Sequence, residues 1–517
     1  MNDFIQEISK NAKYPLELVT PHILQIRMYN DKLMFQDAIS CALSILHRLK
    51  EEIDINETKI NSEIEKTTNT ITESFDDILN MKEMKDAKQV SIMQILYCII
   101  YSCFYAENPK TLTLVALKMV QLSLMHGISK YSCIGFTAFA IVLCRMGNSL
   151  SYTIGQLSLQ LLEKTNSKEL VPNVNLAFYA TISPLFAPLC NILTPLRKTA
   201  LASFEIGQYH WSNVCAGTYY CFSFYIGSVN LSTLLDEMIK LEEVLKSGRK
   251  QFMALNQAIM NLQDHNIDNP SILSGEFFDQ KCLFDNGGLK SDIANTCSIC
   301  CVVAYLFDDI ESASRMIEHC KALGNCFGIV ISQIYFDFYH GLVTSSMAKT
   351  FDKKDEFVNN IAEIIRKLEY HEKDSSANFS NKVNLLKAEL AVILKKESEA
   401  KSNFDMAISL SKENGFVIEE AISLERASIF YSDLGLEQHA TKLLYQSYIC
   451  FKQWGAVHKL YHMAVKYPTI RKVLIESPEK LESCPQSNKT IAGDVESVSM
   501  LTNDSSLGNK NTKSEQN

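Results

Sequence analysis

The sequence predicts an all-α fold in which helical hairpins follow one another along the chain. Only 11 prolines and 19 glycines occur in 517 residues, which is too few for the many turns of an all-β protein of this size. Apolar residues recur at helical spacing through most segments. Near the C-terminus, one helical pattern occurs twice in succession. Together these observations indicate repeated pairs of helices.

The repeated pattern identifies candidate packing residues. Each copy places a small, a large and a small residue on one helix face, followed by a glycine: Ala400, Phe404, Ala407 and Gly415, then Ala440, Leu444, Ser447 and Gly455, each 40 positions later. Small residues let a neighbouring helix approach, and the large residue fills the groove between helices, as in the second helix of a tetratricopeptide repeat. The chain is therefore expected to form a tetratricopeptide-like α-solenoid, an architecture that commonly serves as a binding surface.

Two further residues extend this pattern. Ala38 takes the position of Ala400 in an expected hairpin over 30–50. Trp454 lies at helical spacing from Tyr448 and Phe451, so we expect it in the core or as a cap over the last repeat.

The N-terminal region, residues 1–262, is expected to consist of helical repeats. After the hairpin at 30–50, helices are predicted at 91–106, 111–126, 131–146, 151–165 and 211–225, with one long helix over about 231–260. Gly127 and Gly147 stand where left-handed helix caps are expected. The stretch 171–195 is apolar but contains four prolines, which predicts short, interrupted helices.

The remaining chain divides by composition. Residues 263–292 are polar and contain Pro270 and three glycines, which predicts a loop; residues 293–378 form middle helical hairpins; and residues 379–470 hold the tandem repeats. The acidic pair Glu419–Glu420 is expected at a helix start, where it favours the helix dipole. Residues 471–517 are rich in Ser, Asn, Lys and Glu and poor in aromatic residues, which predicts a disordered tail.

Composition and motifs argue against several functions. The net charge of −9, with acids and bases well mixed, disfavours a nucleic-acid-binding protein. No phosphate-binding loop, protein-kinase motif, zinc-protease motif or nucleophile elbow occurs, so no catalytic residue is assigned. The sixteen cysteines are scattered and mostly lie in apolar runs, which indicates reduced thiols and a cytoplasmic protein. The pair Cys297 and Cys300 lacks a second ligand pair, so no metal and no cofactor are expected.

Two uncharged stretches are long enough to cross a membrane. One has 18 residues between Lys88 and Glu107, and the other has 30 residues between Glu205 and Asp236. Both contain several polar side chains and neither has a flanking excess of positive charge. Buried helices of a solenoid explain them better than membrane spans do, and a membrane-associated helical protein is kept as an alternative.

Several segments resemble a known family. They are ERASIFY at 425–431, WGAVHK at 454–459 followed by Tyr467–Pro468, and the upstream segments 26–49, 118–144 and 256–280. In this order they are similar to the tetratricopeptide-like helical region of the "predicted ATPase" module of multidomain signalling kinases. Those proteins are hybrid sensor histidine kinases and serine/threonine kinases with a two-component sensor domain. The resemblance covers most of residues 21–470.

The resemblance implies a role in signal transduction but carries over no catalytic residue. Members of that family also contain a protein-kinase domain, an ATPase domain, a GAF domain and a histidine-kinase core, and this sequence shows none of their motifs. We therefore expect a non-catalytic helical-repeat module of phosphorelay-type signalling that binds protein partners, possible kinase or ATPase subunits among them, through the concave face of its solenoid. The alternative is a regulatory part or fragment of a sensor kinase whose catalytic domains lie on other polypeptides or are lost.

Overall fold

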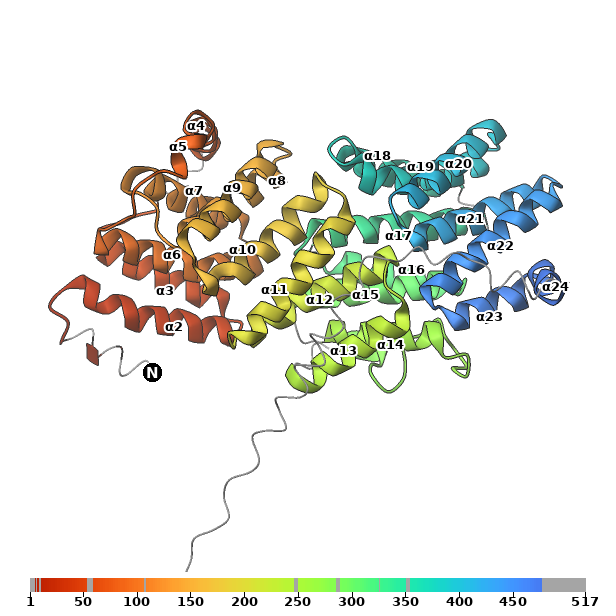
Figure 1. Ribbon diagram of the computed structural model, residues 1–517, viewed down its shortest axis with the longest axis horizontal. Helices are drawn as coiled ribbons and strands as arrows, with labels where there is room; N and C mark the ends of the chain where they lie inside the picture. The colour runs from red at the N-terminus through yellow and green to blue at the C-terminus, as the bar shows by residue number, and fades with distance from the viewer. Residues whose placement is uncertain are drawn as a thin grey trace, which may run out of the picture. The chain divides into compact units, whose positions relative to one another are not determined.

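The computed structural model describes residues 5, 7–8, 11–53, 59–106, 108–245, 250–284, 289–324, 326–349 and 354–476 (Figure 1). It divides into two compact units, Met1–Met463 and Ala464–Asn517. The ordered elements of the described residues are helices, and strand-type pairing there is limited to two isolated bridges, Glu83–Ile128 and Ser274–Asp279. The predicted all-α fold is confirmed.

The first half of the large unit contains helices that mostly pack against their neighbours in sequence. They are η1 (Pro15–Leu18), α2 (Val19–Asp31), α3 (Phe35–Arg48), α4 (Ile60–Glu73), α5 (Phe75–Ile78), α6 (Ala87–Tyr105), α7 (Pro109–His126), α8 (Ser132–Arg145), α9 (Leu150–Thr165), η3 (Lys168–Leu170) and α10 (Val171–Ala177). Helix pairs such as α2 with α3 and α8 with α9 form hairpins. Gly147 follows α8 with a φ of 70°, as expected for the predicted left-handed cap. Gly127 ends α7 with a φ of 97° but a ψ of 178°, so its positive φ does not give the left-handed helical cap that was predicted.

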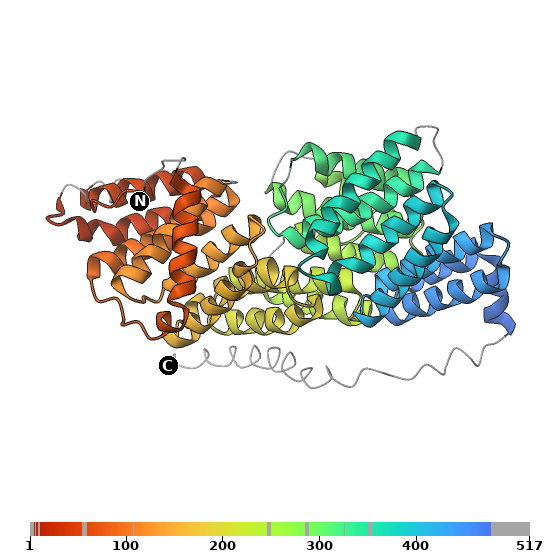
Figure 2. The same ribbon diagram turned by 90° about the horizontal axis from the view of Figure 1, so that it is seen from above.

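The second half of the large unit continues in the same manner. Its helices are α11 (Leu193–Glu205), α12 (Tyr209–Ile226), α13 (Leu231–Leu245), α14 (Lys250–Gln263), η7 (Gln280–Leu283), α15 (Lys290–Leu306), α16 (Ile310–Ala322), α17 (Val330–Ala348), α18 (Lys354–Glu372), α19 (Ser376–Ile393), α20 (Glu397–Glu413), α21 (Val417–Asp433), α22 (Glu437–Trp454) and α23 (Val457–Lys466). The view from above in Figure 2 shows α18 to α22 as adjacent rods, and α19 with α20 and α21 with α22 are two successive hairpins.

The prediction of one long helix over 231–260 is wrong. Two helices, α13 and α14, occupy this segment and pack against each other. Periodicity alone does not reveal such a break, because the apolar spacing continues on both sides of it.

The apolar, proline-containing stretch is irregular, as predicted. A π-helical segment (Phe178–Ile182) and two short 3-10 helices, η5 (Ser183–Leu185) and η6 (Leu189–Ile192), connect α10 to α11. The buried amide of Asn378 in α19 holds this connection, since its Nδ2 donates to the carbonyl oxygens of Pro184 and Ala187, each at 2.7 Å, and its Oδ1 accepts from the N–H of Leu189 at 2.8 Å. One side chain thus replaces helical hydrogen bonds that the irregular backbone lacks.

The predicted loop over 263–292 is largely non-helical in its described part, and α14 anchors it. Asn261 Nδ2 donates to the carbonyl oxygens of Pro270 and Ile272 at 3.0 and 2.8 Å. The small unit begins within α23, and its described part includes α24 (Pro468–Glu476). The first six residues of the predicted tail therefore belong to a helix, and residues 477–517 lie outside the described residues.

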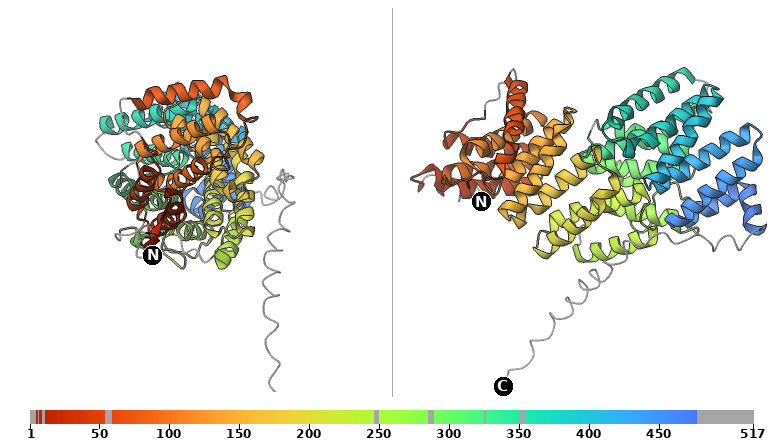
Figure 3. Two further views of the ribbon diagram at one scale, coloured as in Figure 1. Left: turned by 90° about the vertical axis from the view of Figure 1, so that its left-hand side faces the viewer. Right: turned by 45° about the horizontal axis from the view of Figure 1, so that its top comes forward.

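Helices far apart in sequence also meet within the large unit. Helix α12 packs against α21, and the turn after α12 touches the start of α21 at Gly227. A Cβ atom added at Gly227 would lie 2.8 Å from Cγ1 of Ile418, and the φ of 74° already disfavours other residues. Figure 3 gives two further views of the helices of the chain.

This contact gives a first prediction. Replacing Gly227→Ala is expected to lower the free energy of unfolding by about 2–4 kcal/mol, because left-handed backbone strain of about 1 kcal/mol adds to overpacking of about 1–3 kcal/mol. Gly415→Ala is the matched control: its φ is also 74°, but no atom lies within 4 Å of the added Cβ. Urea unfolding of both variants checks the difference, and equal effects would contradict the α12–α21 contact.

Candidate functional site

The two copies of the repeated pattern occupy equivalent places in successive hairpins. Ala400, Phe404 and Ala407 of α20 are fully buried. In α22, Ala440 and Leu444 are buried, and the Ser447 hydroxyl donates to the carbonyl oxygen of Ala421 at 2.7 Å. The ring of Phe404 lies 5.6 Å from that of Phe430 in α21, and Ser447 also contacts α21, so both patterns face this helix.

The other residues singled out by the sequence lie at helix ends and in the core. Gly415 and Gly455 follow α20 and α22 with φ values of 74° and 90°. Ala38 is fully buried in α3. Trp454 is buried at the end of α22, and its ring lies 5.4 Å from that of Phe224 in α12.

A set of buried ion pairs, which we call the ion ladder, joins the first helices of successive hairpins. Its members are Lys349, which follows α17 and is 34% exposed, and the buried residues Lys382 and Glu389 (α19), Glu419, Glu425 and Arg426 (α21) and Lys459 (α23). The sequence pattern does not reveal these pairs, although Glu419 occupies the helix start expected for it. The available signal was a pair of charges seven residues apart in each helix, at 382 and 389 and again at 419 and 426, which places both on one face.

The centre of the ion ladder is Glu389, whose two carboxylate oxygens both have cationic partners. Arg426 binds it in a bidentate manner, with Nε 2.7 Å from Oε1 and Nη2 3.0 Å from Oε2, and Lys349 Nζ lies 2.8 Å from Oε2. Burial alone would raise the pKa of Glu389. Arg426 and Lys349 more than offset that effect, so the pKa lies well below its usual value.

A second ion pair is surrounded by aromatic rings. Lys382 Nζ lies 2.9 Å from Oε1 of Glu419, and both side chains are almost completely buried. The same ammonium lies 4.1 and 4.9 Å from the ring centroids of Phe416 and Tyr335, within the range of cation–π attraction. Burial lowers the pKa of Lys382, and the carboxylate of Glu419 opposes that shift.

Other helices of the chain pack against the first helices of these hairpins. Helix α17 packs against α19, and α12 packs against α21. Lys459 in α23 extends the ion ladder to the following helix. Its Nζ lies 3.2 Å from Oε2 of Glu425 and donates to the carbonyl oxygen of Leu306 at the end of α15. The faces of α19 and α21 that carry the ion ladder therefore pack against other helices of the chain.

His340 in α17 gives this region a pH dependence. It is buried, and Lys321 Nζ donates to its Nε2 at 3.0 Å, so the ring is neutral. Burial, followed by the positive charges of Lys321 and Lys367, lowers the pKa of His340 to about 3, whereas Glu363 acts in the opposite direction. Protonation of this ring would place two cations within hydrogen-bonding distance.

The unfolded chain binds a proton at position 340 below about pH 6.5, while the folded chain does so only near pH 3. Stability from this site is therefore complete above pH 6.5 and falls as the pH decreases toward 3, by about 2 kcal/mol between pH 7 and pH 5. His340→Gln keeps an acceptor for Lys321 and cannot titrate. We expect the wild type to lose about 2 kcal/mol more than this variant over that interval in urea unfolding, and identical pH profiles would contradict the assignment.

The cysteines of the C-x-x-C segment lie inside α15. Burial raises the pKa of Cys297 to about 12 and that of Cys300 well above its ordinary value. A buried, protonated thiol is a poor nucleophile and a poor metal ligand. No cluster of three or more His, Cys, Asp or Glu side chains suited to a metal ion is found among the described residues.

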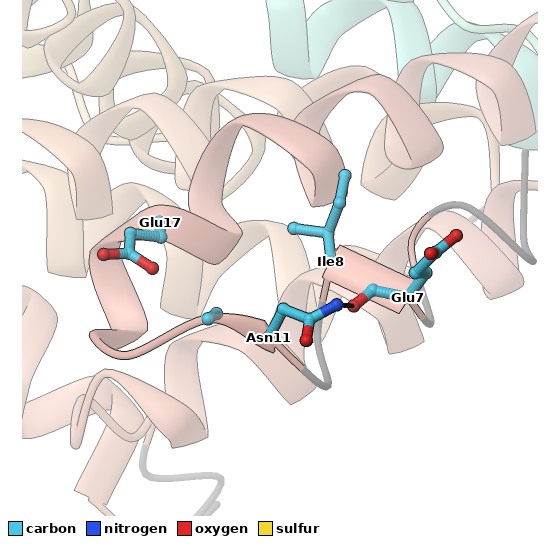
Figure 4. Close-up of a pocket in the computed structure, with 5 residues that line it drawn as sticks. Glu7, Ile8, Asn11 and Glu17 are labelled. Atoms are coloured by element: carbon cyan, nitrogen blue, oxygen red, sulfur yellow. Dashed lines mark hydrogen bonds between the residues drawn. The ribbon is translucent and has the colours of Figure 1, made fainter.

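One surface depression lies near the N-terminus and is drawn in Figure 4. It is open and is lined by Glu7, Ile8, Asn11, Ala12 and Glu17. Asn11 Nδ2 donates to the carbonyl oxygen of Glu7 at 3.0 Å, and Glu17 accepts from the N–H of Lys13. Two of its lining residues, Asn11 and Glu17, take part in these hydrogen bonds.

Helix α6 is the one described helix that is long and apolar enough to cross a membrane. Half of its apolar window is buried inside the protein, where α6 packs against α2, α3 and α7. The second uncharged stretch of the sequence is divided between α12 and α13.

Comparisons with protein-family models, with curated proteins and with solved structures each find no significant match to this chain. The resemblance to the helical region of signalling kinases therefore stays a prediction from the sequence.

Proposed function

We propose that this chain is a non-catalytic, tetratricopeptide-like α-solenoid that binds protein partners in a kinase-linked signalling pathway. The observation that carries the proposal is the 40-residue repeat, since its helix-face residues are buried at equivalent places in α20 and α22. Stacked helical hairpins create extended surfaces without a catalytic centre. The link to kinases depends on the resemblance of segments such as ERASIFY at 425–431.

The ion ladder supports a scaffold in preference to an enzyme. Its charges pair with one another across successive helices, and the described contacts leave no open cleft in which a substrate could meet Lys382 or Glu389. Because the faces of α19 and α21 that carry the ion ladder pack against other helices, the partner surface belongs on other faces of these hairpins.

Capture from cells with the tagged full chain, after reversible cross-linking, tests the function. We expect enrichment of a defined kinase or ATPase polypeptide over an unrelated helical protein of equal charge. The purified chain is expected to show no ATP hydrolysis by itself. Enrichment of no protein would contradict partner binding, and ATP turnover that follows the purified chain would contradict a non-catalytic role.

A further inference from the structure

The N-terminal end of the helical array leaves an unusual number of apolar side chains exposed. Of the 18 large hydrophobic residues that are exposed in the described part of the chain, six lie within the first 34 positions: Ile8, Tyr14, Leu16, Leu24, Leu33 and Met34. The terminal helix of a stacked array normally has a polar outer side, which keeps the end of the array soluble. Apolar residues concentrated at one end therefore indicate that another surface covers it.

One side of α2 is exposed along its whole length, and we call this surface the α2 face. Helix α2 packs against α3 and α6 and buries Val19, Ile23 and Ile26 on its other side. Leu24, near the centre of the α2 face, is 49% exposed. The face continues into η1, and its exposed residues, three or four positions apart, are Lys13, Glu17, Thr20, Leu24, Arg27 and Asp31.

The charges of the α2 face are arranged symmetrically about position 22. At distances of nine, five and two positions on either side of it, the matching residues are Lys13 and Asp31, Glu17 and Arg27, and Thr20 and Leu24. Lys13 belongs to this row because its N–H donates to a carboxylate oxygen of Glu17 at 2.9 Å. In each charged pair the two signs are opposite.

This symmetry matches a second copy of the same helix. When two copies pack antiparallel about a two-fold axis, residues at equal distances on either side of the centre come opposite each other. Lys13 of one copy then faces Asp31 of the other, and Glu17 faces Arg27. Parallel packing in register would instead place like charges opposite each other. Complementarity of this kind fixes the orientation and the register of an interface.

The depression in Figure 4 lies at the N-terminal end of the α2 face, because Glu17 lines it together with Glu7 and Ile8. In antiparallel packing this end receives the C-terminal end of α2 from the second copy. The segment 32–34, Lys-Leu-Met, then approaches Glu7 and Ile8, so that a cation meets a carboxylate and apolar side chains meet each other. The exposed Leu33 and Met34 are thereby covered.

Arg27 suits a contact with this depression. An arginine stem is apolar and its guanidinium binds carboxylates, whereas the depression offers one isoleucine and two glutamates. Within its own chain Arg27 bonds to the side chain of Cys98 in α6. A guanidinium has five N–H donors, so this bond leaves donors for a carboxylate of a second copy.

We propose that the chain forms a symmetric dimer in which the α2 faces of two copies pack antiparallel. By symmetry the dimer contains two Lys13–Asp31 pairs and two Glu17–Arg27 pairs. A pair of single helices gives an interface at the small end of the stable range, so we expect a dissociation constant of about 1–10 μM. The dimer is independent of the partner binding proposed above, because that proposal places partners on the hairpins of α19 and α21.

Sedimentation equilibrium of the full chain at about 1–100 μM tests the proposal. We expect a dimer that weakens as salt rises, because exposed ion pairs are screened. Arg27→Glu and Glu17→Arg each place like charges opposite each other twice per dimer, so each is expected to weaken self-association at least tenfold. Arg366→Glu is the matched control: Arg366 is exposed on α18, outside the α2 face, and its replacement is expected to leave the dimer unchanged.

Mixing the two variants gives the sharpest result. An equal mixture of Arg27→Glu and Glu17→Arg again pairs opposite charges throughout, so a heterodimer is expected although neither variant dimerises alone. Circular dichroism checks that each variant is folded. Lys13→Asp and Asp31→Lys form a second set with the same expected behaviour and replace the first set if one of its members does not fold.

Four results would overturn the proposal. They are a monomer at all concentrations up to about 100 μM, a dimer that neither charge reversal weakens, folded variants whose mixture stays monomeric, and assemblies that grow beyond a dimer. The last result would indicate head-to-tail contacts between different surfaces, which do not close into a two-fold dimer.

Discussion

Arg426→Met lowers the free energy of unfolding by about 3–5 kcal/mol, because removal of one partner leaves a buried charge without compensation. Arg426 holds both oxygens of Glu389, and the carboxylate is 2% exposed. In this variant Lys349 stays in contact with Oε2 of Glu389, so the stability loss is expected at about 3 kcal/mol if the ammonium of Lys349 moves closer to the carboxylate. Urea unfolding at pH 7 measures the change.

A double-variant cycle separates the ion pair from the packing of the arginine stem. Replacing both members, with Glu389→Leu and Arg426→Met, removes the unpaired charge and is expected to recover most of the lost stability. Lys396→Met is the control for loss of a cation, because Lys396 pairs with Glu399 at an exposed site and is expected to change stability by less than about 1 kcal/mol. A loss below 1 kcal/mol in Arg426→Met would contradict the buried pairing.

The ion ladder also has a pH dependence of known sign. The folded-state pKa of Glu389 is depressed, so its contribution is present above the unfolded pKa and is lost as the pH falls through the folded value. His340 acts in the same direction at higher pH, between about 6.5 and 3. The two effects can be separated, because His340→Gln removes the loss of stability that starts below pH 6.5 and leaves the effect of Glu389, which occurs at lower pH.

The sequence contains enough information to predict the helices and the repeated packing pattern. Phe404 and Leu444 could be paired because their surroundings repeat after 40 positions and because helix packing is a local, periodic property. Gly147 could be assigned as a cap from its place after an apolar run. These properties depend on residues within a few turns of one another.

Contacts set by the path of the whole chain could not be predicted in this way. Lys382 and Glu419 are 37 positions apart and lie in different hairpins, and each looks like a solvated charge in its own segment. The contact of Gly227 with Ile418 depends on how many hairpins separate them and on the angle between successive hairpins. Single-sequence periodicity does not specify those angles.

Phe404→Ala is the most direct test of the repeat, and it is expected to lower the free energy of unfolding by about 3–5 kcal/mol. The phenyl ring is fully buried in α20 and lies 5.6 Å from the ring of Phe430 in α21. Its removal leaves a cavity between two hairpins that the close-packed small residues Ala400 and Ala407 cannot fill. Leu444→Ala, at the equivalent position of α22, is expected to cost about 2–5 kcal/mol.

Met406→Ala is the matched control, because Met406 lies on the same helix but is 47% exposed, and its effect is expected to stay within about 0.5 kcal/mol. Amide hydrogen exchange also shows where stability is lost, because neighbouring repeats stabilise each other mainly through their shared interface. Phe404→Ala should raise exchange first in α20 and α21, and later in α6 and α7. Equal effects of Phe404→Ala and Met406→Ala would mean that the pattern at 400–407 does not pack the hairpins together, and the assignment of a tetratricopeptide-like repeat would then be lost.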